Sequence, residues 1–255
     1  MTMTELEFCR RHIEMARKMF LVSEGIEVSK KGDFDLVTSI DKKIETYLSE
    51  KIKENFPGDS IIGEEFKPDG EIIGRTWTID PIDGTVNMVN GIPLTGIQLA
   101  LIENNDVCFS YIYLSQLKEE YYAIKGHGTF LNGKECKVNS SVGLMEAIIS
   151  FGDFSHNSVD NAKKELSMIS SLYSYVSKIR MFGSAAVDFS FAASGKTSGC
   201  VVITKNLWDV LPGYLLCKES GAVVGNMDGG EYRIGDGGII VGANRQIFNK
   251  ILEAL

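Results

Sequence analysis

Apolar residues near the N-terminus recur at helical spacing. They stand at Leu6, Cys9, Ile13, Ala16 and Phe20. This period of three and four predicts one amphipathic helix. Thr4 and Glu7 have the spacing of a capping box at its start, and Gly25 marks its end. A second apolar face, formed by Ile44, Leu48 and Ile52, predicts another helix over residues 41–55.

The pattern then changes to short apolar runs typical of strands. Residues 60–63 and 77–79 form two such runs, separated by a polar excursion. Closely spaced strand signals follow over residues 96–102, 107–113, 120–124 and 129–138. Asn104-Asn105-Asp106 and Asn132-Gly133 suit hairpin turns between them, so this stretch predicts an antiparallel meander.

After about residue 140, strands alternate with helices. Strands are expected over residues 147–151, 178–181, 199–203, 222–225 and 238–241, and helices over 159–175, 183–195, from 208 onward, and over 246–255. This order predicts an α/β half spanning residues 141–255, which follows an α+β half spanning residues 1–140. The chain therefore belongs to the layered α/β class.

Charge narrows the choice of partners. The 255 residues include 26 basic and 34 acidic side chains, which gives a formal charge of −8. We therefore expect no nucleic acid and no anionic membrane as a general partner. Five cysteines without C-x-x-C spacing favour reduced thiols and a cytoplasmic location. No signal peptide and no apolar run of the ~20 residues that span a bilayer are expected.

One stretch carries the candidate chemistry. The apolar run Trp77-Thr78-Ile79 leads into Asp80-Pro81-Ile82-Asp83-Gly84-Thr85. Pro81 predicts a turn that aims both carboxylates and the Ile82 carbonyl at one point. Hard oxygen ligands without thiols suit Mg²⁺. Gly84 and Thr85 follow where a helix could begin, so free N–H groups would face an anion at the same point.

Three acidic motifs in this order resemble the signature of the inositol monophosphatase family. They are Gly63-Glu64-Glu65, Asp80-Pro81-Ile82-Asp83-Gly84-Thr85 and Trp208-Asp209. The resemblance covers essentially the whole chain. It implies the alternating α-β-α-β-α sandwich of the inositol monophosphatase and fructose-1,6-bisphosphatase type, with the site at the junction of the two halves. It also implies Mg²⁺-dependent, Li⁺-sensitive hydrolysis of a small phosphate monoester, and a homodimer.

The resemblance assigns roles to the acidic residues. One Mg²⁺ would bind Glu64, Asp80 and the Ile82 carbonyl, and a second would bind Asp80, Asp83 and Asp209; a third ion would be held largely by water. The catalytic set would be Glu64, Thr85 and Asp41, with Thr85 and Asp41 orienting the attacking water. Glu65 would support Glu64, and Lys30 would approach the metals from a loop.

Substrate contacts are also implied by the resemblance. The N–H groups of Gly84 and Thr85 would hold phosphate oxygens, and Gly183, Ser184, Ala185 and Asp209 would contact the substrate. Several of these residues also have simpler explanations. Asp41 and Asp209 suit helix N-termini as charges alone, Lys30 suits a solvated surface, and small residues at 183–185 suit tight packing.

One departure leaves the substrate open. Val202 stands where inositol phosphatases carry a glutamate that binds a ring hydroxyl. NADP, fructose bisphosphate, a sugar phosphate and adenosine bisphosphate therefore remain alternatives to inositol phosphate. A different class also remains, because some members of the family are regulatory binding proteins of transcription complexes.

Overall fold

The first helix begins at the capping box that the sequence predicts, and the second begins two residues before its expected start, after the N-cap Thr38. The computed structural model describes residues 4–21, 28–30, 36–66, 70–154 and 158–255. Helix α1 spans Glu5–Leu21 and α2 spans Ser39–Asn55. Glu7 N donates to Thr4 Oγ1 at 3.3 Å, while Thr4 N donates to Glu7 Oε2 at 3.0 Å. A short antiparallel pair, β1 (Val28–Lys30) and β2 (Leu36–Thr38), precedes α2; the predicted helix end at Gly25 lies outside the described residues.

The first sheet contains the predicted meander. Its strands are β3 (Ser60–Gly63), β4 (Thr76–Asp83), β5 (Gly96–Glu103), β6 (Asp106–Leu114), β7 (Glu119–Ile124), β8 (Gly128–Leu131) and β9 (Lys134–Cys136). They pair in sequence order; β3 and β4 are parallel and each later pair is antiparallel. Asn104, Asn105 and Asn132 have φ of 52°, 58° and 49°. These left-handed conformations are those of tight hairpin turns, as predicted.

The second sheet is built from the C-terminal half. Its strands are β10 (Ile148–Phe151), β11 (Lys178–Met181), β12 (Gly199–Val202), β13 (Val223–Asn226) and β14 (Ile239–Gly242), in the order β11-β10-β12-β14-β13. Four helices accompany it: α4 (Val159–Leu172), α5 (Ala185–Ala193), α6 (Leu207–Glu219) and α7 (Arg245–Leu252). Strands β10, β11 and β12 are parallel, while β14 is antiparallel to both its neighbours.

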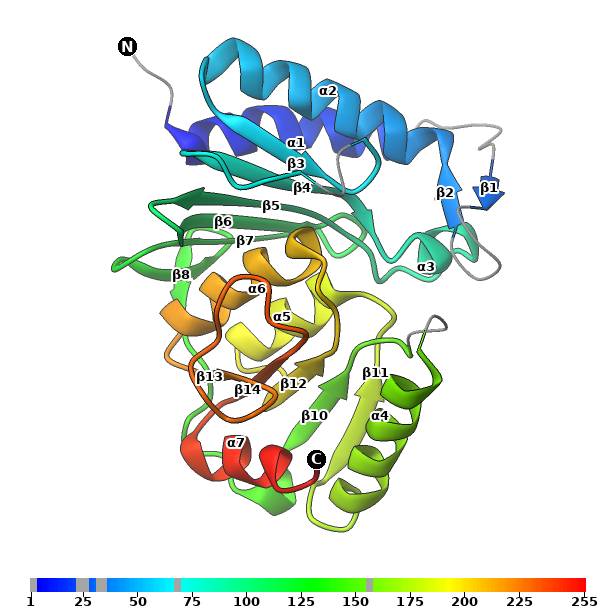
Figure 1. The fold of residues 1–255 in the computed structure, drawn as a ribbon, viewed down its shortest axis with the longest axis vertical. Coiled ribbons are helices and arrows are strands. Elements are labelled where there is room, and N and C mark those ends of the chain that lie inside the picture. The colour runs from blue at the N-terminus through cyan, green and yellow to red at the C-terminus, as the bar shows by residue number, and fades with distance from the viewer. Residues whose placement is uncertain (1–3, 22–27, 31–35, 67–69, 155–157) are drawn as a thin grey trace.

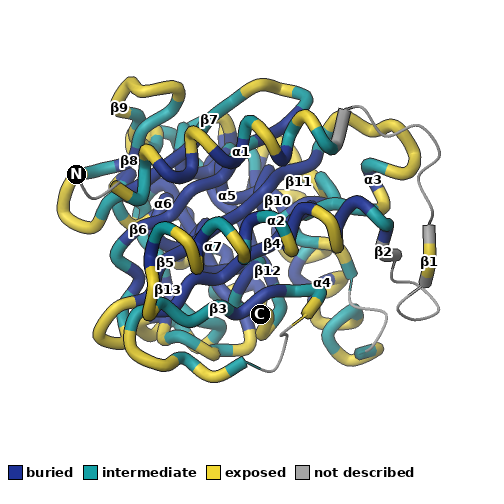
Figure 2. The backbone as a smooth tube through the Cα atoms, turned by 90° about the horizontal axis from the view of Figure 1, so that it is seen from above, coloured by how far each residue is buried: buried dark blue, intermediate teal, exposed yellow. Residues whose placement is uncertain are grey.

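Five layers alternate through the molecule (Figure 1). Helices α1 and α2 cover one face of the first sheet, α5 and α6 lie between the two sheets, and α4 and α7 cover the outer face of the second. Residues along α1 and α2 alternate between buried and exposed, as an amphipathic surface helix requires (Figure 2). The predicted α-β-α-β-α sandwich is therefore confirmed. The boundary near residue 140 stays a prediction, although β9 ends at Cys136 and β10 begins at Ile148.

The segment from Asp80 to Asp83 is a strand with a bulge, whereas the sequence predicted a turn. Asp80 pairs with Gln98 and Asp83 pairs with Gly96, so two residues of β4 oppose one residue of β5. Pro81 lacks the N–H that a regular ladder needs, and a bulge accommodates this loss. The bulge keeps both aspartates at the carboxyl end of one strand rather than on a loop.

Two features bear on the expected environment. All five cysteines lie within the described residues and carry free thiols, as predicted. None of the helices in the described ranges is both long and apolar enough to cross a membrane.

The packing of α5 against α6 gives a stability prediction. A Cβ added to Gly213 of α6 would lie 2.0 Å from the ring of Phe189 on α5. Helix propensity alone would make Gly213→Ala stabilising by about 1 kcal/mol. Overpacking of the central layer outweighs this gain, so we expect the free energy of unfolding to fall by about 1–3 kcal/mol. Denaturant unfolding measures it, with Gly143→Ala, which meets no atom within 4 Å, as the control. A stabilised Gly213→Ala variant would contradict the packing argument.

Candidate active site

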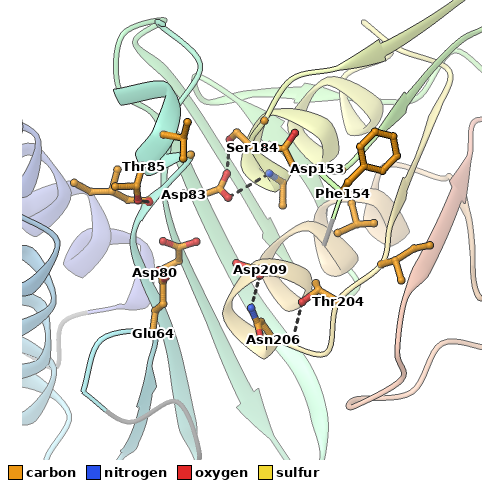
Figure 3. Close-up of a pocket in the computed structure, with 18 residues that line it drawn as sticks. Glu64, Asp80, Asp83, Thr85, Asp153, Phe154, Ser184, Thr204, Asn206 and Asp209 are labelled. Carbon is orange, nitrogen blue, oxygen red and sulfur yellow. Dashed lines mark hydrogen bonds between the residues drawn. The ribbon is translucent and has the colours of Figure 1, made fainter. Parts of the chain in front are cut away.

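A pocket of about 340 Å³ lies where β3 and β4 meet the helices and strands of the second half (Figure 3). Most of the site residues expected from the sequence line it. They are Glu64, Asp80, Ile82, Asp83, Gly84, Thr85, Gly183, Ser184, Ala185 and Asp209. Val202 lines the same pocket. Segments that are more than a hundred residues apart in the chain thus meet around one cavity.

Three carboxylates converge in this pocket. Asp80, Asp83 and Asp209 each offer an oxygen, and these oxygens lie within 4.8 Å of one another. Glu64 follows β3 and borders the same pocket, but its carboxylate is outside that group of three. The charge of Glu64 still acts on Asp80 more strongly than those of Asp83 and Asp209. The structure therefore brings all four predicted acids to one cavity, with Asp80, Asp83 and Asp209 closest together.

Asp80 is the most deeply buried of the four. It is 1% exposed, and its Oδ2 accepts a hydrogen bond from Gln98 Nε2 at 3.3 Å. Burial, followed by the charges of Glu64, Asp83 and Asp209, raises its pKa well above the usual value. Its Oδ1 has no hydrogen-bond partner among the described residues. An ionised carboxylate in this position needs a cation nearby.

Asp83 joins the end of β4 to the start of α5. Ser184 Oγ donates to its carboxylate, and the backbone N–H groups of Ala185 and Ala186 donate at 3.2 and 2.7 Å (Figure 3). These donors lower its pKa, but burial outweighs them and raises the pKa to about 6. Ser184 is also the N-cap of α5, because its Oγ accepts from Val187 N at 3.3 Å. In this structure the predicted substrate contacts Ser184 and Ala185 therefore bind Asp83.

Asp209 reaches the pocket from the first turn of α6. Asn206 Nδ2 donates to Asp209 Oδ2 at 2.9 Å, and the backbone N–H of Asn206 donates to Thr204 Oγ1 at 3.2 Å (Figure 3). The helix start thus aims Asp209 at Asp80 and Asp83 instead of leaving it as a terminal charge in solvent.

The predicted Thr85–Asp41 pair exists. Thr85 Oγ1 lies 3.3 Å from Asp41 Oδ1 and 3.0 Å from the Ile82 carbonyl oxygen. Asp41 is 1% exposed, and its Oδ2 accepts from Thr38 N at 2.9 Å and from Thr38 Oγ1. Burial raises the pKa of Asp41, while the hydrogen bonds from Thr38 and Thr85 oppose the shift. Asp41 therefore completes the capping box of α2 with one oxygen and holds Thr85 with the other.

Glu65 and Lys30 were predicted to support the metal site, and the structure describes the surroundings of only the first. The N–H of Glu65 donates to Glu45 Oε2 at 2.7 Å, so the chain at Glu65 is fixed to α2. Lys30 is the last residue of β1, and its side chain lies outside the described part of the structure.

Two glycines allow the halves to approach closely at the pocket. Gly84 has φ of 83°, and a Cβ there would lie 2.9 Å from the Leu94 carbonyl and 3.1 Å from that of Gly183. Gly183 has φ of 70°. Buried Asn87 ties these segments together, since its Nδ2 donates to the carbonyls of Leu94 (2.9 Å), Phe182 (2.7 Å) and Gly183 (3.2 Å). The small residues here serve close backbone packing as well as the pocket wall.

Sequence reasoning missed several residues around the pocket. These are Gln98, Asn87, Asp153, Phe154, Thr204 and Asn206. The sequence did contain a signal for Gln98. It interrupts the apolar run of β5 with an amide, which must find a hydrogen-bond partner when buried. Asp153 and Phe154 follow β10 after Gly152, and polar or aromatic residues beyond the carboxyl end of a parallel strand are candidates for a site.

The residues of the pocket fit a divalent cation. The donor set is composed of carboxylate oxygens, without histidine or thiol, and hard cations prefer such ligands. The unpartnered Oδ1 of Asp80 points to the same conclusion. Like charges held this close raise one another's pKa unless a cation neutralises them.

Similarity to known proteins identifies the family of this chain. The inositol monophosphatase family matches residues 1–255. The chain belongs to this family. Three relatives of the inositol monophosphatase family illustrate its range. A Thermotoga maritima fructose-1,6-bisphosphatase/inositol-1-monophosphatase is 31% identical, covering 90% of this chain and 87% of its own. A Salmonella typhimurium protein named Nus factor SuhB is 30% identical, with coverages of 90% and 86%.

The third relative is a solved structure. An inositol monophosphatase/NADP phosphatase complexed with Mg²⁺ and phosphate superimposes with a TM-score of 0.84 at 25% identity, covering 97% of this chain and 92% of that one. The fold of the family is therefore shared along nearly the whole chain. The names of these inositol monophosphatase relatives differ in substrate and role, so membership does not specify the substrate here.

The raised pKa of Asp83 predicts how pH affects cation binding. The pKa of Asp83 is about 6 when folded, against about 3.9 for an unfolded aspartate. In the metal-free protein, protonated Asp83 therefore adds to the free energy of unfolding. This contribution is complete below about pH 4 and is lost as the pH rises through 6. Mg²⁺ competes with the retained proton. We expect the Mg²⁺-induced rise in the unfolding midpoint to be at least about twice as large at pH 7.5 as at pH 5.

Thermal unfolding in Mg²⁺ and in EDTA at each pH measures this difference. Subtracting the EDTA midpoint removes the pH dependence of all groups that the cation does not touch. An equal Mg²⁺ shift at both values of pH would show that no site carboxylate holds a proton.

Proposed function

We propose that this protein hydrolyses small phosphate monoesters with Mg²⁺, in the manner of an inositol monophosphatase. The observation that carries the proposal is the meeting of Asp80, Asp83 and Asp209 beside a Thr85–Asp41 pair in one pocket. A carboxylate cluster alone would indicate only cation binding. A hydroxyl held by a buried carboxylate next to that cluster adds a group that can orient water.

The proposed ligand sets are those that the family resemblance implies, and the carboxylates of the pocket support them. One Mg²⁺ would be held by Glu64, Asp80 and the Ile82 carbonyl, and a second by Asp80, Asp83 and Asp209; a third would be held mainly by water. Bound Mg²⁺ supplies activation of water and neutralisation of the charge on phosphate and leaving group. Two ions sharing Asp80 account for a carboxylate that is fully buried and has one oxygen without a protein donor.

The protein's own groups perform the remaining tasks. Thr85 Oγ1 lies within hydrogen-bond distance of both the Ile82 carbonyl oxygen and Asp41 Oδ1. With its hydrogen donated to Asp41, the lone pairs of that hydroxyl would accept a hydrogen from the attacking water and orient it. The N–H groups of Gly84 and Thr85 would hold phosphate oxygens. Gly183, Ser184, Ala185 and Asp209 would border the leaving group, with Ser184 Oγ accepting a hydrogen bond from it.

The substrate depends on the opposite wall of the pocket. Phe154, Val202 and Ile203 give this wall apolar character, and Asp153, Thr204 and Asn206 add polar groups. Val202 cannot accept a hydrogen bond from a ring hydroxyl. Inositol phosphate therefore stays one candidate beside NADP, fructose bisphosphate, a sugar phosphate and adenosine bisphosphate.

A regulatory role is the second candidate function. A 30% identical relative is named Nus factor SuhB, which supports a binding role. The formal charge of −8 opposes direct contact with RNA. A partner retained from lysate equally by wild type and by Asp83→Asn would favour a role independent of hydrolysis. Li⁺ inhibition, a cytoplasmic location and a homodimer stay predictions based on the family.

Loss of one proposed ligand tests the function. We expect Asp83→Asn to lower Mg²⁺-dependent phosphate release by more than the roughly 100-fold that loss of a supporting residue costs. The amide cannot supply a charged ligand to a hard cation. Phosphate release measures the effect, circular dichroism checks folding, and Asp160→Asn on the exposed side of α4 is the control. Wild-type activity that survives complete chelation would refute the metal assignment.

Restoring the missing acceptor tests the substrate. We expect Val202→Glu to raise kcat/KM for inositol 1-phosphate about tenfold relative to NADP, fructose bisphosphate and adenosine bisphosphate. A hydrogen bond to a charged group contributes about 1.5–3 kcal/mol, and 1.4 kcal/mol corresponds to a factor of ten. A panel of these esters measures the ratio, with Val202→Ile as the control for size. An unchanged ratio would show that residue 202 does not select the leaving group.

A further inference from the structure

A second buried carboxylate on α2 faces the candidate site one helical turn after Asp41. Glu45 is 1% exposed, as is Asp41, whereas the intervening Lys42 and Lys43 are exposed. Residues four positions apart lie on the same helix face, separated by about 6 Å along the axis. The helix therefore directs two acids inward, since Glu45 binds the chain after β3 and Asp41 binds the chain after β4.

Glu45 holds the backbone that follows β3. Its Oε2 accepts from Glu65 N at 2.7 Å, and its Oε1 accepts from Phe66 N at 3.1 Å. These two N–H groups immediately follow Glu64. On the other side, Glu64 N donates to the Ile79 carbonyl of β4 at 3.2 Å. The backbone of Glu64 is thus fixed by β4 through its own N–H and by Glu45 through the next two.

The chain makes room for this carboxylate at Gly63. A Cβ on Gly63 would lie 2.1 Å from Glu45 Oε1 and 2.5 Å from its Cδ. Only glycine allows the Glu45 carboxylate to lie directly against the end of β3. The close approach is therefore a built feature of the strand end and not an incidental surface contact.

The two acids of α2 hold two neighbouring segments of the same side of the pocket. Asp41 binds Thr85 beyond the end of β4, while Glu45 binds the chain beyond the end of β3. Because both belong to one rigid helix, the separation of the two strand ends is fixed by the helix spacing. Thr85 and Glu64 both line the pocket.

We propose that Glu45 is a positioning residue that places Glu64 for cation binding by accepting the N–H groups of Glu65 and Phe66. This inference rests on the proposed function, since it assigns Glu64 to Mg²⁺. Glu45 is not among the described residues that line the pocket. Its loss would leave two N–H groups without their charged acceptor and would free the backbone of Glu64 to move.

Glu45→Gln tests this role with little change of shape. A glutamine side chain has one carbonyl oxygen, so one of the two N–H groups would face an NH₂ group. We expect the Mg²⁺ concentration for half-maximal phosphate release to rise about tenfold, as for other residues that support metal ligands. The Mg²⁺-induced rise in the unfolding midpoint should shrink in parallel. Glu50→Gln, an exposed change on the same helix, should leave both quantities unaltered.

Gly63→Ala displaces the Glu45 carboxylate by steric overlap rather than by a change of its chemistry. Its methyl group must displace Glu45 without removing any charge, so we expect a similar rise in the Mg²⁺ requirement. A Mg²⁺ requirement within twofold of wild type for Glu45→Gln would overturn the proposal. Failure of both variants to fold in EDTA would also overturn it, because Glu45 would then be an anchor of the fold itself. A wild-type protein without Mg²⁺-dependent hydrolysis would instead refute the proposed function.

Discussion

The carboxylate of Asp83 connects the two halves of the molecule at the pocket. It ends β4 of the first sheet and accepts donors from Ser184, Ala185 and Ala186 at the start of α5. Anions are stabilised at a helix N-terminus, where N–H groups have no partners within the helix. This contact fixes the central helical layer against the end of β4. The pocket wall formed by Gly183–Ala185 depends on it.

The same arrangement sets the electrostatic character of the site. Asp80 lies fully buried beside Glu64, Asp83 and Asp209, and only Gln98 donates to it among the described residues. Buried like charges destabilise a fold unless protons or cations neutralise them. Because the pKa values of Asp80 and Asp83 are raised in the fold, the metal-free protein retains protons on these two acids at pH values where the unfolded chain has released them. A divalent cation replaces those protons, so cation binding and stability are coupled.

The sequence predicted the layers and most of the pocket because their signals are local or recur in fixed motifs. Helical spacing located α1 and α2, and asparagine-rich turns located the meander. The turn predicted for the Asp80–Asp83 segment was wrong, since Pro81 suits a turn and a bulge equally. Glu45 and Asn87 escaped notice for another reason. Glu45 stands beside two lysines and resembles a solvated helix residue, while the carbonyls that Asn87 binds lie as far as 96 positions away.

In the proposed function, the two sides of the pocket have different chemical tasks, so its carboxylates do not specify the substrate. Glu64, Asp80, Asp83 and Thr85 come from β3, β4 and the start of α3 (Thr85–Val89), and they face the phosphate in the proposed reaction. Phe154, Val202 and Ile203 come from the ends of β10 and β12, and they face the leaving group. In the proposed function, substitutions at Phe154, Val202 or Ile203 would change which ester fits. Relatives named for inositol phosphate, fructose bisphosphate and NADP are therefore compatible with one hydrolytic centre. In the proposed function, side chains at the ends of the C-terminal strands select the substrate, and the departure at Val202 lies among them.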